Sequence, residues 1–390
     1  EYFSNRSKIN IFEKRFKKFV HRNYASSFGS GRMALFSILR SLKIEPNDEV
    51  ILQGFTCNVV PRAIKSIGAK PIYVDIEPNT FNMDIDLLLN AITDNTKAII
   101  IQHTFGIPMS LSKIENIIGG RDIAIIEDCA HSFHPVLNGN EKNFLSFSFF
   151  STDHSKPLNT HIGGVVCTNS IEHGELIAKI ASQAKKLNVI QSFWLSISFL
   201  IEYITQKPDL YFFTRYIIGA FNYVGLIFNW PDNHKIIEDG NPKGFYAMSS
   251  IQAILGISQL RRIKENQKHR KEIFNVLETS IGWYNSDRSL PLLRYAFLVK
   301  NRDYFLSDKK NGVLSSIWFD SPISGGSELY DDVDYYEGLC PIAEIVSKHI
   351  VNVSITSKMN ISSLSELSNF NRSSLLRPNM FNKKDFLNKN

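Results

Sequence analysis

Short apolar runs alternate with amphipathic stretches along the first part of the 390-residue chain. Such runs are typical of strands buried on both faces, and the stretches between them have helical periodicity. The alternation predicts a mostly parallel sheet covered by helices, which is a three-layer α/β architecture. The expected strands are 50–52, 71–74, 98–101, 123–126, 144–150 and 164–167, and the expected helices are 11–22, 32–42, 56–67, 84–91 and 110–119.

The second half of the chain follows a different pattern. Residues 171–240 are unusually apolar, but charged residues interrupt them before any run reaches the roughly 20 residues of a membrane-spanning helix. A long helix is expected over 249–281, followed by a smaller α+β arrangement. The predicted domains are a large α/β domain over 1–240, a small C-terminal domain over 241–370 and a loose tail over 371–390.

Composition and charge narrow the function. Hydrophobic residues make up 43% and charged residues 21% of the chain, which fits a globular protein. The net charge of +6 is spread along the chain, which favours anionic small molecules or a membrane surface over nucleic acid. The four cysteines have no paired spacing and no histidine at metal-site distance, so we expect reduced thiols and no metal. No charged segment followed by an apolar one opens the sequence, and we expect a cytoplasmic protein.

A glycine-rich loop, Gly29-Ser30-Gly31, leads into the helix expected over 32–42. Glycines let a ligand approach the backbone closely, and a helix N-terminus offers free N–H groups and a positive dipole to an anion. A bound phosphate is one interpretation, and a tight turn is the other.

The apolar run 123–126 ends in two acids, Glu127 and Asp128. Open α/β sheets bind ligands at the carboxyl ends of their strands. Because neighbouring strand residues point to opposite faces, one acid should face a site and the other should point away. The alternative is an ordinary strand-end Asp that caps a loop.

A single lysine, Lys156, lies in a polar stretch between two apolar strands. An isolated loop lysine is usually a solvated charge. This one is preceded by Ser155 and follows both the glycine loop and the acid-bearing strand, which favours a role in chemistry.

Together, these motifs and their order resemble the DegT/DnrJ/StrS family of nucleotide-sugar aminotransferases that depend on pyridoxal 5′-phosphate (PLP). That family shares the fold type I architecture of aspartate aminotransferase. The resemblance runs from about Phe12 to Leu367. It also rests on residues 46–51, 68–71, 248–253 and 340–344 and on His103 with Phe105-Gly106.

The resemblance implies roles for individual residues. Lys156 would carry the cofactor as a Schiff base, and Asp128 would hold the protonated pyridine nitrogen. Cys57 stands where the family often has an aromatic residue that stacks on the cofactor ring. The remaining implied cofactor contacts are Gly31, Arg32 and Ser151 at the phosphate and His131 at the ring hydroxyl, and the candidate substrate contacts are His103 and His154.

The resemblance also implies an activity. A homodimer would transfer an amino group from L-glutamate to a keto group of a nucleotide-activated sugar, through the pyridoxamine form of PLP. Enzymes of this kind serve cell-surface polysaccharide and lipopolysaccharide biosynthesis, including O-antigen.

Three alternatives stay open. The stretch between Lys156 and the double glycine 163–164 is one residue shorter than usual, and a shifted register would put His154 on the cofactor side. Relatives with a histidine there are sugar dehydratases, so a dehydratase is one alternative. A non-catalytic, membrane-associated family member is another. The apolar insert is either a dimer interface with helices that close the cleft or, around 190–230, a peripheral attachment to the inner membrane.

Overall fold

The structure is a computed structural model, and it describes residues 6–133, 145–205, 237–238, 241–242, 245–284, 286, 289–308, 315–325, 327–357, 359–362, 364 and 370–378. The chain divides into two compact units, each made of two separate segments. Unit 1 is Glu1–Lys43 with Phe149–Arg261, and unit 2 is Ile44–Ser148 with Arg262–Asn390. This grouping differs from the consecutive domains predicted from the sequence, because the chain leaves unit 1 after residue 43 and returns to it at residue 149.

Unit 1 contains the strand order β1-β8-β7, in which β7 starts in unit 2 and ends in unit 1. Strand β1 pairs antiparallel with β8 from Tyr24 opposite Thr168 to Phe28 opposite Gly164. No strand was predicted over 24–28, since this segment contains two serines and lacks a long apolar run. The elements are α1 (Arg6–Phe19), β1 (Tyr24–Phe28), α2 (Gly31–Ser41), β7 (Ser146–Ser151), β8 (Gly164–Thr168), α6 (Ile171–Gln183), α7 (Val189–Thr205), β9 (Ile237–Glu238), β10 (Asn241–Pro242) and α9 (Ser250–Leu260).

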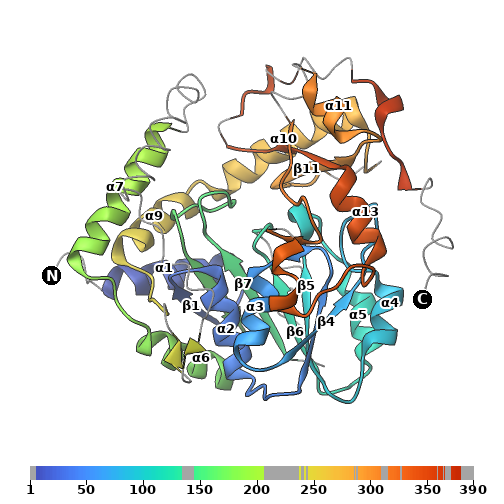
Figure 1. The fold of residues 1–390 in the computed structure, drawn as a ribbon. Coiled ribbons are helices and arrows are strands. Elements are labelled where there is room, and N and C mark those ends of the chain that lie inside the picture. The colour runs from blue at the N-terminus through green and yellow to red at the C-terminus, as the bar shows by residue number, and fades with distance from the viewer. Residues whose placement is uncertain are drawn as a thin grey trace. The chain divides into compact units, whose positions relative to one another are not determined.

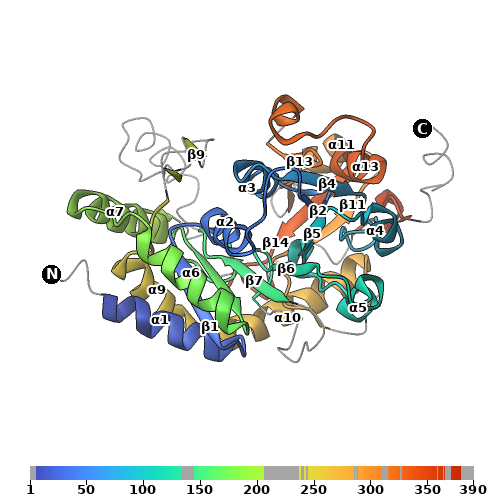
Figure 2. The same ribbon diagram turned by 90° about the horizontal axis from the view of Figure 1, so that it is seen from below.

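Helices α1 and α9 pack side by side in unit 1 (Figures 1 and 2). Phe12 and Phe16 form the buried stripe of α1. The ring of Phe12 lies against Gly256 of α9, where an added Cβ would come within 2.4 Å of it. Helix α9 begins with a capping box, in which the Ser249 side chain and Gln252 satisfy each other's backbone N–H groups. Close approach of these two helices therefore depends on a residue with no side chain.

The strands of unit 2 follow the order β6-β5-β2-β4. They pair in parallel, as the apolar runs predict. Helices α4 and α5 lie on these strands (Figure 1), and a core of aliphatic side chains fills the space between, including Ile51, Leu88, Ile99, Ile114 and Ile125. The elements are β2 (Glu49–Gln53), β3 (Thr56–Cys57), α3 (Val59–Ser66), β4 (Lys70–Val74), α4 (Ile85–Ala91), β5 (Thr96–Gln102), η2 (Thr104–Gly106), α5 (Leu111–Ile118) and β6 (Ala124–Asp128).

The C-terminal part of unit 2 is the α+β arrangement that the sequence predicts. Its antiparallel sheet has the order β11-β14-β12, and a short strand, β13, pairs in parallel with β3. The long helix expected over 249–281 is interrupted at Arg261 and Arg262, so α9 and α10 are separate. The elements are α10 (Ile263–Ile281), β11 (Arg294–Leu298), α11 (Arg302–Ser307), β12 (Ser315–Ser316), β13 (Ile323–Ser324), η4 (Ser327–Leu329), η5 (Asp331–Val333), α13 (Pro341–His349), β14 (Ile350–Ser354) and η7 (Arg372–Ser374).

The predicted loose tail begins with ordered residues. Residues 371–378 include η7, Leu375 is buried, and Leu376 N donates to Leu298 O at 2.9 Å. Residues 379–390, and 206–236 of the apolar insert, lie outside the described residues. Within the part that is described, no helix is both long and apolar enough to cross a membrane.

Candidate functional site

The glycine loop of unit 1 forms a cradle at the N-terminus of α2. Ser30 caps the helix, with its Oγ accepting from Met33 N at 3.3 Å. Gly31, the first helical residue, faces Ser151 at the end of β7, and an added Cβ would lie 3.1 Å from Ser151 Cβ and 3.3 Å from its Oγ. An added Cβ on Gly164 would come within 2.4 Å of Ser30 O. The loop therefore fits together only because both positions lack a side chain.

The cradle offers several donors to an anion. The N–H groups of the first turn of α2 have no partner within the helix, and the helix dipole is positive at this end. Ser151 places a hydroxyl beside Gly31, and the half-buried Arg32 is the second residue of α2. The structure thus brings together the three residues that the sequence predicts at a phosphate.

Lys156 lies in the loop between β7 and β8 of unit 1. The base of the loop is closed by the hydrogen bond between Thr152 Oγ1 and Thr160 Oγ1 at 2.6 Å and by Thr160 N donating to Thr152 O at 2.8 Å. Inside the loop, Lys156 N donates to Asp153 O at 3.0 Å. Asn159 N donates to Gln259 Oε1 of α9 at 2.8 Å. The backbone that carries Lys156 is therefore held at both ends.

The two basic side chains of this loop have different surroundings. His154 Nδ1 lies 2.6 Å from Asp153 Oδ1, and the His154 side chain is 61% exposed. Lys156 is half-buried. Burial would raise the pKa of Asp153, but the hydrogen bond and charge of His154 and the charge of Lys156 lower that pKa overall. His154 thus pairs with its neighbour at the surface.

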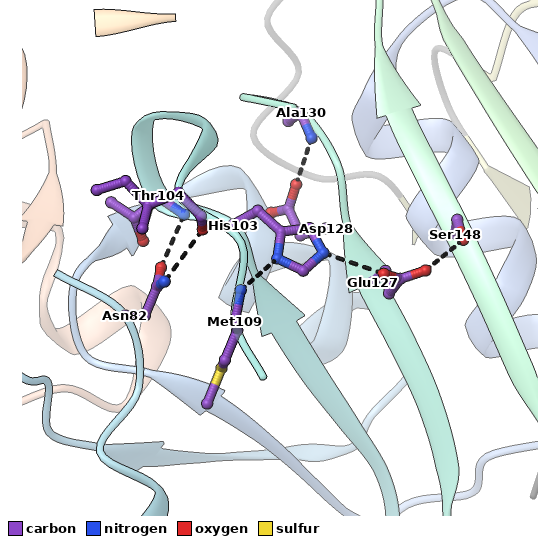
Figure 3. A network of polar contacts seen from close by, with 9 residues as sticks. Asn82, His103, Thr104, Met109, Glu127, Asp128, Ala130 and Ser148 are labelled. Carbon is purple, nitrogen blue, oxygen red and sulfur yellow. Dashed lines mark hydrogen bonds and ion pairs between the residues drawn. The ribbon is translucent and has the colours of Figure 1, made fainter. Parts of the chain in front are cut away.

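The two acids at the end of β6 in unit 2 point in different directions (Figure 3). Glu127 is fully buried; its Oε1 lies 3.1 Å from His103 Nε2, and its Oε2 accepts from Ser148 Oγ at 2.8 Å. Asp128 is 4% exposed, and its Oδ1 accepts from Ala130 N at 2.9 Å. The alternation along the strand therefore separates the acids, as the sequence predicts.

His103 is fully buried, and both of its ring nitrogens are engaged. Nδ1 accepts from Met109 N at 3.3 Å, so the hydrogen bonds assign the proton to Nε2, which donates to Glu127. A ring nitrogen of His103, a Glu127 carboxylate oxygen and Cys129 Sγ lie within 4.8 Å of one another, a spacing that could hold a metal ion. A metal on Nε2 would need the proton to move to Nδ1, where Met109 N already donates. The substrate contact predicted for His103 does not fit this buried network, which favours a structural role.

His131 lies in an aromatic cluster of unit 2. Its Nδ1 accepts from Phe105 N at 3.2 Å, and its ring stacks on Phe105 with centroids 6.0 Å apart. The Trp318 ring lies 4.8 Å from the His131 ring, and the Arg294 guanidinium lies 4.0 Å over Trp318. Burial lowers the pKa of Arg294 to about 10. Trp318 and Arg294 could not be predicted as neighbours of His131 from the sequence, because no local pattern links them to residue 131.

Cys57, the other predicted cofactor contact of unit 2, is half-buried in β3. It is opposite Ser324 of β13 in a parallel pair. The neighbouring Thr56 Oγ1 donates to Gln102 Oε1 at 2.7 Å. The Thr56 side chain thus ties β3 to Gln102 at the end of β5, one residue before His103.

The mostly parallel sheet covered by helices has the fold of the PLP-dependent aminotransferases. DesV of S. venezuelae, solved in complex with a ketimine intermediate, has a TM-score of 0.72 at 17% identity, covering 95% of this chain and 90% of that chain. E. coli GDP-4-keto-6-deoxy-D-mannose-3-dehydratase with bound hydrated PLP has a TM-score of 0.68 at 19% identity, covering 96% and 94%.

The model of the DegT/DnrJ/EryC1/StrS aminotransferase family matches residues 1–206 and 232–369, and the chain belongs to this family. An uncharacterized protein of Methanocaldococcus jannaschii is 29% identical over 371 residues, which are 89% of this chain and 85% of that protein. The UDP-2-acetamido-2-deoxy-3-oxo-D-glucuronate aminotransferase of Pseudomonas aeruginosa is 38% identical over 178 residues, which are 44% of this chain and 49% of the enzyme. These findings confirm the predicted fold class, family and cofactor, PLP.

Proposed function

We propose that the protein transfers an amino group from L-glutamate to a keto group of a nucleotide-activated sugar, with PLP held by Lys156, Asp128 and the cradle of α2. The observation that carries this proposal is the cradle itself, which lies in the same unit as the lysine loop. The P. aeruginosa aminotransferase supports the substrate class, and the aminotransferase family supports the reaction. Cell-surface polysaccharide biosynthesis is the proposed context.

The cradle fits a phosphate monoester. Gly31 leaves the space beside Ser151 that a Cβ would fill, so phosphate oxygens can reach the N–H groups of α2 and the Ser151 hydroxyl. Arg32 would add a charge-assisted hydrogen bond, which is roughly twice as strong as one between neutral groups. Here the residues present suit the phosphate of PLP.

Asp128 suits the partner of a protonated ring nitrogen. Its carboxylate is buried, and its Oδ1 accepts a hydrogen bond from Ala130 N. A buried carboxylate favours the charged form of a nearby base, so Asp128 would keep a pyridine nitrogen protonated. When bound, PLP supplies the electron sink for this chemistry. His131 would donate through Nε2 to a neighbouring oxygen, because Nδ1 is already an acceptor.

Lys156 would act through its ε-amino group. As the nucleophile it would hold the cofactor, and once released from it, the amine would take a proton from the donor carbon and return it to a neighbouring position. A cationic, partly desolvated site lowers the pKa of such an amine and makes it a better base. The fixed ends of the loop would keep Lys156 in place during both steps.

Reduction with borohydride tests this role directly. In the wild type, the reduced cofactor should stay on the peptide that contains Lys156, whereas K156A should retain none covalently. K179A, at an exposed lysine of α6, is the matched control and should behave like the wild type. Labelling of another lysine in the wild type would contradict the assignment.

The dehydratase alternative needs His154 in place of the lysine. His154 is exposed and paired with Asp153, which favours Lys156 as the cofactor-side residue. Incubation of the wild type and of H154A with L-glutamate shows by absorbance whether the reaction of the cofactor depends on His154. A transaminase converts its bound cofactor to the pyridoxamine form, which 2-oxoglutarate reverses, and H154A should keep this response. Loss of the response in H154A alone would support the dehydratase register.

The apolar side of α7 is proposed as the surface through which two copies associate. Val189, Ile190, Phe193 and Leu200 are exposed on one helix, and Phe193 is 54% exposed. Exposed apolar patches of this kind mark interaction sites. F193E should convert a dimer to a monomer in sedimentation velocity, while K179E should not. A monomeric wild type that cosediments with anionic liposomes, and loses this with F193E, would replace the dimer by a membrane contact.

A further inference from the structure

Unit 1 contains a cavity that shares no residue with the cradle or the lysine loop. It lies between α1, β1, α6, the start of α7 and the segment that leads into α9, and its volume is about 130 Å³. This is roughly ten times what a single water needs, so a molecule of about ten non-hydrogen atoms has room there. The residues that matter for recognition are Glu13, Ser26, Ser192, Arg6 and Lys186.

Glu13 supplies a carboxylate to this cavity. Oε1 accepts from Ser27 N at 2.8 Å and from Ser27 Oγ at 2.7 Å. Burial raises the pKa of Glu13, although the bonds from Ser27 and the charge of Arg6 act in the opposite direction. Oε2 makes no further hydrogen bond or ion pair with the residues that the structure describes. A carboxylate in such surroundings is stabilised by a donor or a cation.

Two hydroxyls of the cavity wall also lack partners. Ser26 is 7% exposed and Ser192 is 3% exposed, and both line the cavity. Across the described ranges, neither Oγ has a hydrogen-bond partner. Two hydroxyls and one carboxylate in the wall of the same cavity give a small polar ligand three groups to bind.

The cavity carries the opposite charge where it meets solvent. Arg6 and Lys186 line it and are both exposed, so they lie at its rim. A ligand that matches this arrangement has a cationic donor for the interior and an anion for the rim. It must also be small.

We propose that this cavity binds a free α-amino acid. The ammonium group donates to Glu13 Oε2 and to the hydroxyls of Ser26 and Ser192, and the carboxylate pairs with Arg6 and Lys186. Because none of these residues belongs to the proposed cofactor site, the cavity is a second amino-acid site, suited to regulation rather than to amino transfer.

Calorimetry on the full chain tests the proposal. The holoenzyme is first reduced with borohydride so that its cofactor no longer exchanges with amines, and the twenty standard L-amino acids are then titrated. At least one should bind, and the corresponding α-hydroxy acid, which lacks the ammonium group, should bind at least tenfold more weakly. E13Q and S26V should each weaken amino-acid binding at least tenfold, while the matched control E175Q, at an exposed glutamate of α6, should not.

Three results would overturn the second site. These are no binding of any amino acid, equal binding of the hydroxy acid, or E13Q and S26V both binding like E175Q. S26V introduces a β-branched residue, which suits a strand, so S26V still tests the proposal if E13Q folds poorly. The absorbance response of unreduced protein to glutamate reports the proposed amino transfer separately, so either idea can fail without the other.

Discussion

Exchanging the two adjacent carboxylates of β6 for amides separates a structural acid from a functional one. Glu127→Gln and Asp128→Asn each preserve the shape of the side chain and remove its charge. Both carboxylate oxygens of Glu127 accept a hydrogen bond, from His103 Nε2 and from Ser148 Oγ. An amide has one acceptor and one donor, so one of those two donors would face an N–H group.

The magnitude follows from these contacts. Glu127 and His103 are fully buried, and a buried donor left without an acceptor costs about 1–3 kcal/mol. Rotation of the Ser148 hydroxyl toward another acceptor would bring the cost to the lower end. Asp128→Asn keeps Oδ1 as the acceptor for Ala130 N, so it should lower the free energy of unfolding by less than Glu127→Gln does. Asp128→Asn should slow amino transfer about a hundredfold or more, because positioning a proton in this way raises a reaction rate by a factor of about 10²–10⁴.

Urea unfolding and the half-reaction with L-glutamate measure the two effects. Glu127→Gln should lose stability and retain the cofactor absorbance and most of the rate, while Asp128→Asn should do the reverse. The division of roles is refuted if Glu127→Gln unfolds like the wild type but transfers no amino group. Equal loss of rate in both variants, with unchanged stability, would also refute it.

Three further predictions concern other parts of the chain. Gly31→Ala should weaken PLP binding at least tenfold, or about 1.4 kcal/mol, because the added Cβ would lie 3.1 Å from Ser151 Cβ. Fluorescence titration of the apoprotein with PLP measures this affinity. An unchanged affinity would exclude the cradle as the phosphate site. Burial raises the pKa of Asp75 to about 6, although the backbone hydrogen bonds that its carboxylate accepts act in the opposite direction. The free energy of unfolding should therefore be highest below about pH 4 and fall by about 3 kcal/mol as the pH rises through about 6. Urea melts of Asp75→Asn should lack this pH dependence. Arg270→Met should lower the free energy of unfolding by about 2–4 kcal/mol in the same melts, because the carbonyl oxygens of Leu292 and Ile355 lose their donor. A loss under about 0.5 kcal/mol would contradict this structural role.

The parallel strands were predictable because each is a self-contained apolar run. β2, β4, β5 and β6 all coincide with runs seen in the sequence to within a few residues. The strand β1 was missed, since Ser26 and Ser27 are paired and buried only through β8 and α1, which no local pattern reveals. The break between α9 and α10 was missed for a related reason, because helical periodicity continues through two arginines that have good helix propensity.

The candidate site shows the same limit more sharply. Residue spacing alone established that Glu127 and Asp128 must face opposite ways, because the side-chain period of a strand is two. It could not say which acid faces a ligand, since that depends on His103 from the neighbouring strand and on Ser148 from the next. Those two partners hold both oxygens of Glu127 in a buried network, and Asp128 is the acid that we propose for the cofactor nitrogen. A local motif can therefore nominate a pair of residues, and long-range hydrogen bonds then select the functional one.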